Sequence, residues 1–187
     1  MSAELLVCMT DSVAAGARRR RALLTPVGLA VFGVSLLLVV LTGLLIDRLL
    51  HIPPLFPGMI GAVVGAPLLL AGSVLTAWCV LRFKKAAGTP VPFNPPTELV
   101  VEGPYVWTRN PMLTGVFTGL FGLGVLIHSL GMVLVSIPAY ILLHVVELKL
   151  VEEPELERRF GTRYLEYKRR VPMFWPRFWR GMKGRGG

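Results

Sequence analysis

Four apolar runs alternate with short polar or proline-containing stretches along the chain. The hydrocarbon core of a bilayer is about 30 Å thick, so a helix of about 20 apolar residues is long enough to cross it. The pattern therefore predicts an all-α integral membrane protein with about four transmembrane helices. The spans, two of them short, extend over Leu23 to Ile46, Gly58 to Leu81, Met112 to Ile127 and Leu130 to Val151.

Turns and small residues predict how these helices pair. The connection from His128 to Gly131 is long enough only for a tight turn, so the last two spans form an antiparallel hairpin whose other ends are neighbours. Gly115, Gly119 and Gly122 recur at spacings of four and three, which predicts close packing along one face of the third span. Pro138 is expected to kink the fourth span.

Basic residues predict the orientation of the spans. They lie before the first span at Arg18 to Arg21, after the second at residues 82–85, and at ten positions beyond Glu153. Of all 20 Lys and Arg residues, only Arg48 falls in a loop on the opposite side. The positive-inside rule then makes the chain a multi-pass protein of a cytoplasmic or inner membrane with both termini cytosolic. The first run is too long to be the apolar part of a cleaved signal peptide, about 7–15 residues, so it is retained.

Composition and charge agree with a membrane protein. The hydrophobic content of 53% and the mean hydropathy of +0.63 exclude an ordinary soluble domain. Because the basic residues border the spans, the net charge of +9 indicates the lipid bilayer and its anionic headgroups as the partner, and no nucleic acid. Cys8 and Cys79 suit neither a disulfide scaffold nor a zinc cluster, so no metal site is expected, and no obligate protein partner is evident.

The chain divides into three regions. Residues 1–22 are expected to form a loose, basic cytosolic tail, residues 23–81 a two-helix membrane anchor, and residues 82–187 the core that carries the chemistry. Within the core, the prolines of residues 82–110 exclude a regular helix and favour a folded binding loop. Across residues 154–170, positions recurring at spacings of four, four and three, namely Leu156, Phe160, Tyr164 and Tyr167, predict a cytosolic amphipathic helix.

Charged and polar residues collect where the open ends of the hairpin should meet. The stretch Arg109-Asn110-Pro111 predicts a helix start with Asn110 as N-cap, an end that attracts anionic groups, although a plain capped helix explains it equally well. Glu152 and Glu153 follow the fourth span beside it.

Two ionisable residues lie inside the predicted fourth span. His144 and Glu147 are three residues apart and so share one helical face. Ionisable groups at membrane depth are costly and often functional. The alternative, in which the two merely pair with each other or reach the headgroups, has equal weight.

The C-terminal half also carries ordered motifs, namely Gly103-Pro104-Tyr105, Arg109-Asn110-Pro111-Met112, Glu152-Glu153-Pro154, Phe160-Gly161 and Val171-Pro172. Together they resemble the isoprenylcysteine carboxyl methyltransferase family, especially its small bacterial and archaeal members. The resemblance implies an integral-membrane methyltransferase without a Rossmann domain. Residues 82–187 would be its core and would enclose S-adenosylmethionine between the loop, the hairpin and the C-terminal segment. The implied reaction is methylation, as carboxyl methylation, of a lipid or prenylated substrate at the cytosolic membrane edge.

The resemblance further implies site residues. The cofactor would contact Thr97, Glu98, Leu99, Val100, Tyr105, Arg109, Asn110, Pro111, Met112, Leu113, Glu152 and Glu153. Candidate catalytic residues are Arg82, which would hold an anionic substrate, and His144 and Glu147; if the acceptor is an amine, His144 or a glutamate with a raised pKa would serve as the base. The chain departs from the family at Asn110, where many members have His, and at Leu148, where the eukaryotic enzymes have a substrate-contacting Arg.

Three other functions fit the same pattern. Phospholipid N-methyltransferases share a helical membrane site with paired glutamates, and the C-terminal half of NADPH-dependent sterol reductases resembles this family. A non-catalytic membrane scaffold would keep the glutamates only for surface charge. Only identification of the product separates phospholipid N-methylation from carboxyl methylation, whereas binding of NADPH would indicate the reductase and binding of neither cofactor the scaffold.

Overall fold

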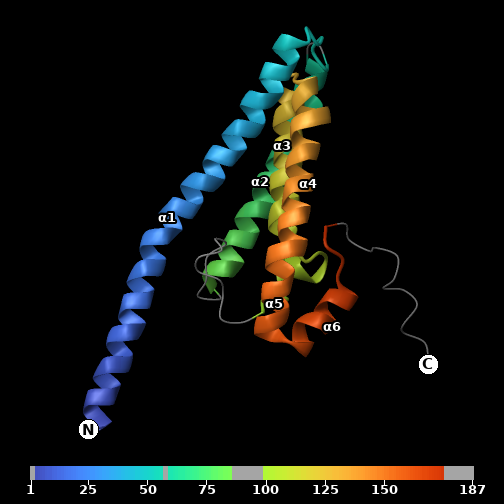
Figure 1. The fold of residues 1–187 in the computed structure, drawn as a ribbon. Helices are drawn as coiled ribbons and strands as arrows, with labels where there is room; N and C mark the ends of the chain where they lie inside the picture. The colour runs from blue at the N-terminus through green and yellow to red at the C-terminus, as the bar shows by residue number, and fades with distance from the viewer. Residues whose placement is uncertain (1–2, 57–58, 86–98, 175–187) are drawn as a thin grey trace, which may run out of the picture.

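The computed structural model describes residues 3–56, 59–85 and 99–174, which are helices and loops without strands. The long helices are α1 (Ala3–Leu49), α2 (Met59–Lys85), α3 (Pro111–Leu126) and α4 (Ile137–Glu147). In Figure 1, α2, α3 and α4 run side by side, while α1 joins them at one end and slants away toward its N-terminus. The shorter helices α5 (Glu153–Phe160) and α6 (Thr162–Arg170) lie at the opposite end, hereafter the α5–α6 end.

Three of the described helices are long and apolar enough to cross a membrane: Pro26–Leu49, Met59–Arg82 and Met132–Phe160. Helix α3 is apolar as well but has 16 residues, about 24 Å at 1.5 Å per residue, and is short for a full crossing. The expected all-α integral membrane fold and its closing antiparallel hairpin are thus confirmed, with α3 as the short member of the predicted set.

The N-terminal region differs from the expected loose tail. Residues from Ala3 onward are helical and continue without a break into the first membrane span. The physical reason is composition, because residues 3–25 are rich in Ala, Leu and Arg, which have the highest helix propensities.

Helices α2 and α3 pack backbone to backbone along the predicted glycine face. A Cβ atom on Gly115 would lie 2.6 Å from Thr76 Oγ1 and 2.9 Å from the Gly72 carbonyl oxygen, and one on Gly122 would lie 2.7 Å from the Gly65 carbonyl oxygen. No side chain fits at these distances, so the small residues permit the contact. The close packing predicted from the glycine spacing is confirmed.

Helix α1 packs against α4 and the π turn before it. The Ser35 and Tyr140 hydroxyls are hydrogen bonded at 2.8 Å, and Gly43 lies against the backbone of Met132. Near the turn at residues 128–131, the Asp47 carboxylate accepts hydrogen bonds from the Ser129 hydroxyl (2.5 Å) and from the Gly131 amide (2.7 Å). Since the first amides of a helix have no partner within it, Asp47 caps the helix that leads into α4.

Two π turns interrupt the last long helix. They are η2 (Met132–Ser136) and η3 (Leu148–Glu152), and each is followed within two residues by a proline, Pro138 or Pro154. A proline cannot donate to the carbonyl four residues earlier and its ring clashes with it, so a wider turn relieves the clash. The disturbance expected at Pro138 therefore takes the form of a π turn.

The predicted amphipathic helix over residues 154–170 is two helices. Gly161 has φ of 54° and separates α5 from α6, while α5 continues from α4 through η3. Positive φ is readily adopted by glycine, so the chain turns here. As a result α6 folds back toward the start of α3, as Figure 1 shows.

Candidate functional site at the α5–α6 end

The start of α3 is joined to the segment that follows α6. The Arg109 amide donates to the Pro172 carbonyl at 2.8 Å, the Asn110 amide to the Met173 carbonyl at 3.1 Å, and the Thr108 hydroxyl to the same Met173 carbonyl at 2.6 Å. Residues more than 60 positions apart in the chain are thus held together by backbone hydrogen bonds. This arrangement fixes the position and direction of the first turn of α3.

Asn110 occupies the predicted N-cap position, and Pro111 is the first helical residue. The Asn110 side chain, however, makes no capping hydrogen bond. Its Nδ2 atom donates to the Met173 carbonyl at 3.4 Å instead. The expected side-chain cap is therefore wrong, because the C-terminal segment competes for the amide. The first-turn amides of Met112 and Leu113 have no acceptor within the helix.

A buried group of charges lies beside this turn. Arg109 forms an ion pair with Glu153, and their side chains are only 11% and 10% exposed. Arg109 also donates to the Val171 carbonyl (3.1 Å) and to the Tyr164 hydroxyl (3.3 Å), and Lys168 Nζ lies 2.6 Å from Glu153 Oε2. The pair therefore links the loop, α5, α6 and the C-terminal segment. Hydrogen bonds to Glu153 and Glu157 raise the pKa of Lys168, which keeps it charged.

Glu152 differs sharply from its neighbour Glu153. Its side chain is exposed, and among the described residues its carboxylate has no hydrogen-bond or ion-pair partner. Glu152 lies near Tyr105 and Glu147, each of which interacts electrostatically with it. Of the two adjacent carboxylates, only that of Glu152 is available to an outside group.

Tyr105 anchors the loop against α2 and α6. It lies in the short helix η1 (Gly103–Val106) and is buried, its carbonyl accepts a 2.7 Å hydrogen bond from the Tyr167 hydroxyl, and its side chain is hydrogen bonded to Cys79. Burial raises the pKa of Tyr105, and the nearby Cys79, Tyr167 and Glu152 raise it further. Tyr105 is therefore a neutral phenol. Its ring is surrounded by protein rather than by solvent.

Arg82 lies on the other side of the loop. Its guanidinium packs under Gly103, where a Cβ atom would lie 3.1 Å from Nε, and it reaches the exposed carboxylate of Glu102 at 3.9 Å. Close by, the rings of Trp78 and Trp107 meet edge to face with centroids 6.0 Å apart. Both indoles are exposed, as is usual for tryptophans at a membrane–water interface.

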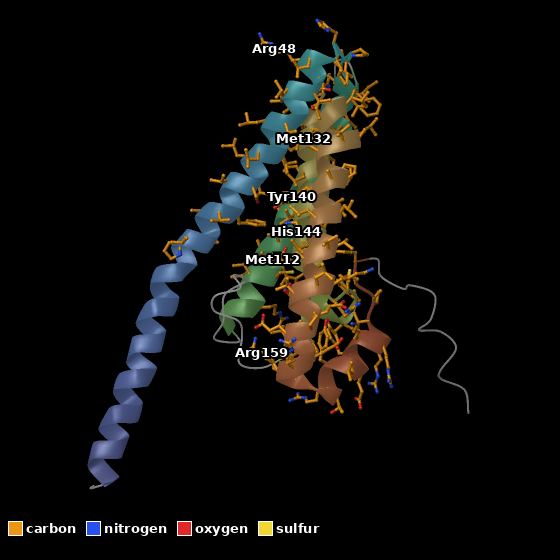
Figure 2. The ribbon with its side chains drawn as sticks, in the orientation of Figure 1. Arg48, Met112, Met132, Tyr140, His144 and Arg159 are labelled. Carbon is orange, nitrogen blue, oxygen red and sulfur yellow. The ribbon has the colours of Figure 1, made fainter. Side chains whose placement is uncertain are left out.

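His144 and Glu147 form the predicted pair on one face of the last long helix. His144 Nδ1 lies 2.8 Å from Glu147 Oε2. The rings of His144 and Tyr140 meet edge to face, with centroids 4.5 Å apart, and the Phe117 ring centroid lies 6.0 Å from that of the imidazole. Phe174 of the C-terminal segment also packs against Phe117, with ring centroids 5.8 Å apart. Figure 2 shows His144 and Met112 at a similar level of the bundle, closer to Arg159 at the α5–α6 end than Met132 is.

The structure brings most of the expected residues to this end but not into a single cluster. Leu99, Val100, Met112 and Leu113 are partly buried, and Leu113 packs on the core formed around Phe117. Thr97 and Glu98 lie outside the described residues. Sequence reasoning missed three side chains that complete the site: Tyr140, Tyr164 and Lys168. The spacing of Tyr164 in the amphipathic pattern was a signal for burial but gave no indication of its polar contacts. Among the residues that the structure describes, no group of His, Cys, Asp and Glu could hold a metal ion.

Comparison with known proteins identifies the family. Residues 60–163, more than half of the chain, match the family model described as phospholipid methyltransferase. The chain is also 31% identical over 100 residues to the nickel-cobalt-cadmium resistance protein NccN of Alcaligenes xylosoxydans xylosoxydans. That alignment covers 54% of this chain and 42% of the relative, so the chain spans less than half of that protein. No solved structure matches. The chain belongs to the phospholipid methyltransferase family, part of the isoprenylcysteine carboxyl methyltransferase-like superfamily.

Proposed function

We propose that the protein methylates a lipid or prenyl-lipid substrate with S-adenosylmethionine at the cytosolic edge of the membrane. The observation that carries the proposal is the difference in surroundings between Glu152 and Glu153, which lie beside the first turn of α3. Glu153 is fully engaged with Arg109 and Lys168, whereas Glu152 is exposed and has no partner among the described residues. Because the family generally uses S-adenosylmethionine, we infer that this cofactor is the ligand of the free Glu152 carboxylate.

The chemistry of the residues present fits that cofactor. A carboxylate at Glu152 can accept hydrogen bonds from the ribose hydroxyls or from the ammonium group, and the first-turn amides of α3 suit the methionyl carboxylate. The half-buried side chains of Leu99, Val100 and Leu113 offer apolar surface for adenine. Arg109 and Glu153, whose side chains bind each other, would act by fixing this turn. When bound, the cofactor supplies a methyl group on a sulfonium for in-line transfer.

The substrate would approach from the lipid. Side chains of η2 and α4, among them Leu134, Leu142 and Leu143, are large, apolar and exposed in the isolated chain, as expected of surfaces that face hydrocarbon. A lipid-borne acceptor could then place its headgroup at the α5–α6 end while its tail stays in the bilayer. The protein's task is alignment of donor and acceptor and exclusion of water.

Two acceptors are consistent with this site. The motifs of the C-terminal half favour carboxyl methylation, which needs no base because a carboxylate is ionised at neutral pH. The family match favours methylation of a phospholipid amine. Radiolabelled methyl groups separate the two, because a methyl ester releases volatile methanol in base and an N-methyl group does not.

The first test is calorimetric titration of the detergent-purified protein with S-adenosylhomocysteine. A hydrogen bond to a charged group contributes about 1.5–3 kcal/mol, so Glu152→Gln should weaken binding roughly 10- to 150-fold. Glu155→Gln is the matched control, because Glu155 is also exposed and pairs only weakly, at 3.7 Å, with Arg159. Binding that Glu152→Gln leaves unchanged would remove this residue from the site. Binding of NADPH alone would favour a reductase, and binding of neither cofactor would favour a scaffold.

A further inference from the structure

The pairing of His144 with Glu147 defines the protonation of the imidazole. A carboxylate can only accept a hydrogen bond, so the 2.8 Å contact requires a proton on Nδ1. In the neutral ring the second nitrogen, Nε2, then carries a lone pair and no proton. Glu147 also fixes the ring orientation, since its side chain lies one helical turn further on.

Nε2 is the unusual atom of this pair. It is buried, and among the described residues it has no hydrogen-bond partner. A buried polar atom without a partner costs about 1–3 kcal/mol, and most such atoms in native proteins are satisfied by a side chain, water or ligand. Tyr140 and Phe117 pack against the imidazole and Phe174 packs against Phe117, and none of these rings donates a hydrogen bond to Nε2. The atom is therefore arranged as an acceptor without an internal donor.

Nε2 also lies close to the expected cofactor residues. His144 contacts Phe117, which is one turn of α3 beyond Leu113, about 6 Å along the axis. Figure 2 shows His144 and Met112 at neighbouring levels of the bundle. A group that donates a hydrogen bond or a proton to Nε2 would thus lie beside α3 rather than in bulk water.

We propose that His144, oriented by Glu147, accepts the proton that a lipid amine must lose before it is methylated. The inference rests on the proposed function and deepens it, because it assigns a base and selects an amine-bearing headgroup over a carboxylate. At neutral pH an alkyl ammonium has no lone pair with which to attack. The carboxylate of Glu147, 46% exposed, stabilises the imidazolium that forms and connects it to the surface.

The step balances as follows. The ammonium of the headgroup gives a proton to Nε2 and becomes a neutral amine. Its lone pair forms a bond to the methyl carbon of the sulfonium donor while the carbon–sulfur bond breaks and its electron pair returns to sulfur. The products are an N-methylated ammonium and a neutral thioether, and the proton on His144 leaves to solvent past Glu147. The charge before and after the step is equal when this proton is counted.

The titratable groups that face His144 come mainly from its own helix. They are Tyr140, whose ring meets the imidazole edge to face, and Glu147 at Nδ1, and Glu152 interacts electrostatically with Glu147. The neighbours from α3 and the C-terminal segment, Phe117 and Phe174, do not titrate. A change in pH dependence after substitution of His144 can thus be assigned to the imidazole or to the substrate amine.

The test measures methyl transfer from radiolabelled S-adenosylmethionine to phosphatidylethanolamine in nanodiscs, for wild type and His144→Asn, between pH 7 and pH 9.5. General-base catalysis contributes about 10²- to 10⁴-fold, so His144→Asn should lower the rate at pH 7 by that factor. The deficit should shrink at least about tenfold at pH 9.5, where more of the amine, with a pKa of about 10, is already neutral. A deficit that does not change with pH would overturn the assignment, because a merely structural role predicts no rescue.

Three further measurements separate the possible failures. Titration with S-adenosylhomocysteine should give the same affinity for His144→Asn as for wild type, and His51→Asn, at the opposite end of the bundle, should leave rate and affinity unchanged. Binding of S-adenosylhomocysteine without methylation of the amine lipid would refute the assignment of the base and leave the proposed function standing, whereas absence of binding would refute both.

Nitrogen-15 NMR of labelled histidine gives a readout without activity. A proton on Nε2 of neutral His144 would overturn the inference, and Glu147→Gln should shift the tautomer.

Discussion

Two adjacent glutamates should respond in opposite ways to the same substitution. Glu153 is 10% exposed and paired with Arg109, which is 11% exposed, so Glu153→Gln leaves a buried guanidinium without its charge partner. Breaking a buried pair in this way costs about 3–5 kcal/mol. At about 2–4 °C per kcal/mol for a chain of this size, the melting temperature should fall by roughly 6–20 °C. Glu152→Gln should shift it by less than about 2 °C, since an exposed substitution usually changes stability by under about 0.5 kcal/mol.

The assay is thermal unfolding of both variants in one detergent, with hydrogen exchange to localise the effect. Faster exchange in Glu153→Gln should appear at α6 and residues 171–173, because Arg109 connects these segments to the start of α3. The double variant Arg109→Met, Glu153→Met should be more stable than Glu153→Gln, as no buried charge is left unpaired. Equal melting temperatures for the two single Gln variants would refute the division of roles between the glutamates.

Two other predictions concern packing and pH. Gly122→Ala should destabilise the α2–α3 contact, because the new Cβ atom would collide with the Leu69 backbone nitrogen. Gly119→Ala should be tolerated, since the nearest atom to its new Cβ is Leu69 Cδ1 at 3.9 Å. The yield of monodisperse protein and its melting temperature compare the two variants. Burial raises the pKa of Tyr167 above its ordinary value of about 10, so the folded state keeps this proton longer than the unfolded state and stability should fall as pH rises above about 10. Tyr167→Phe, which also removes the 2.7 Å hydrogen bond to the Tyr105 carbonyl, should lower stability at neutral pH but make this alkaline fall shallower in melting experiments.

Much of the fold follows from local patterns. Apolar runs of sufficient length predict the membrane helices, the short turn at residues 128–131 predicts the hairpin, and the glycines of α3 predict the close contact with α2. Each of these depends on residues near one another in sequence or on one face of one helix. At the N-terminus, by contrast, weak hydrophobicity and the Arg18 to Arg21 run indicate a loose tail, whereas the helix from Ala3 onward follows from helix propensity.

The polar contacts of the site could not be obtained in the same way. The sequence brings Arg109 and the glutamate pair to one edge, but it does not tell which carboxylate turns inward. That choice depends on the chain reversal at Gly161, which returns Tyr164 and Lys168 to Glu153. Long-range contacts of this kind arise from tertiary packing, and a pattern of apolar positions contains no information about them.

The π turn before α5 accounts for the position of Glu152. In a regular α-helix each residue advances about 100°, so Glu147 and Glu152, five positions apart, would point about 140° away from each other. In η3 the Glu153 amide instead donates to the Leu148 carbonyl, five residues earlier, which widens the turn and brings the two glutamates closer to one face. Pro154 favours this wide turn because it cannot donate to the carbonyl of Leu150. With this wide turn, Glu153 is paired with Arg109 while Glu152 lies near Glu147, as the proposed cofactor site and proton acceptor would require.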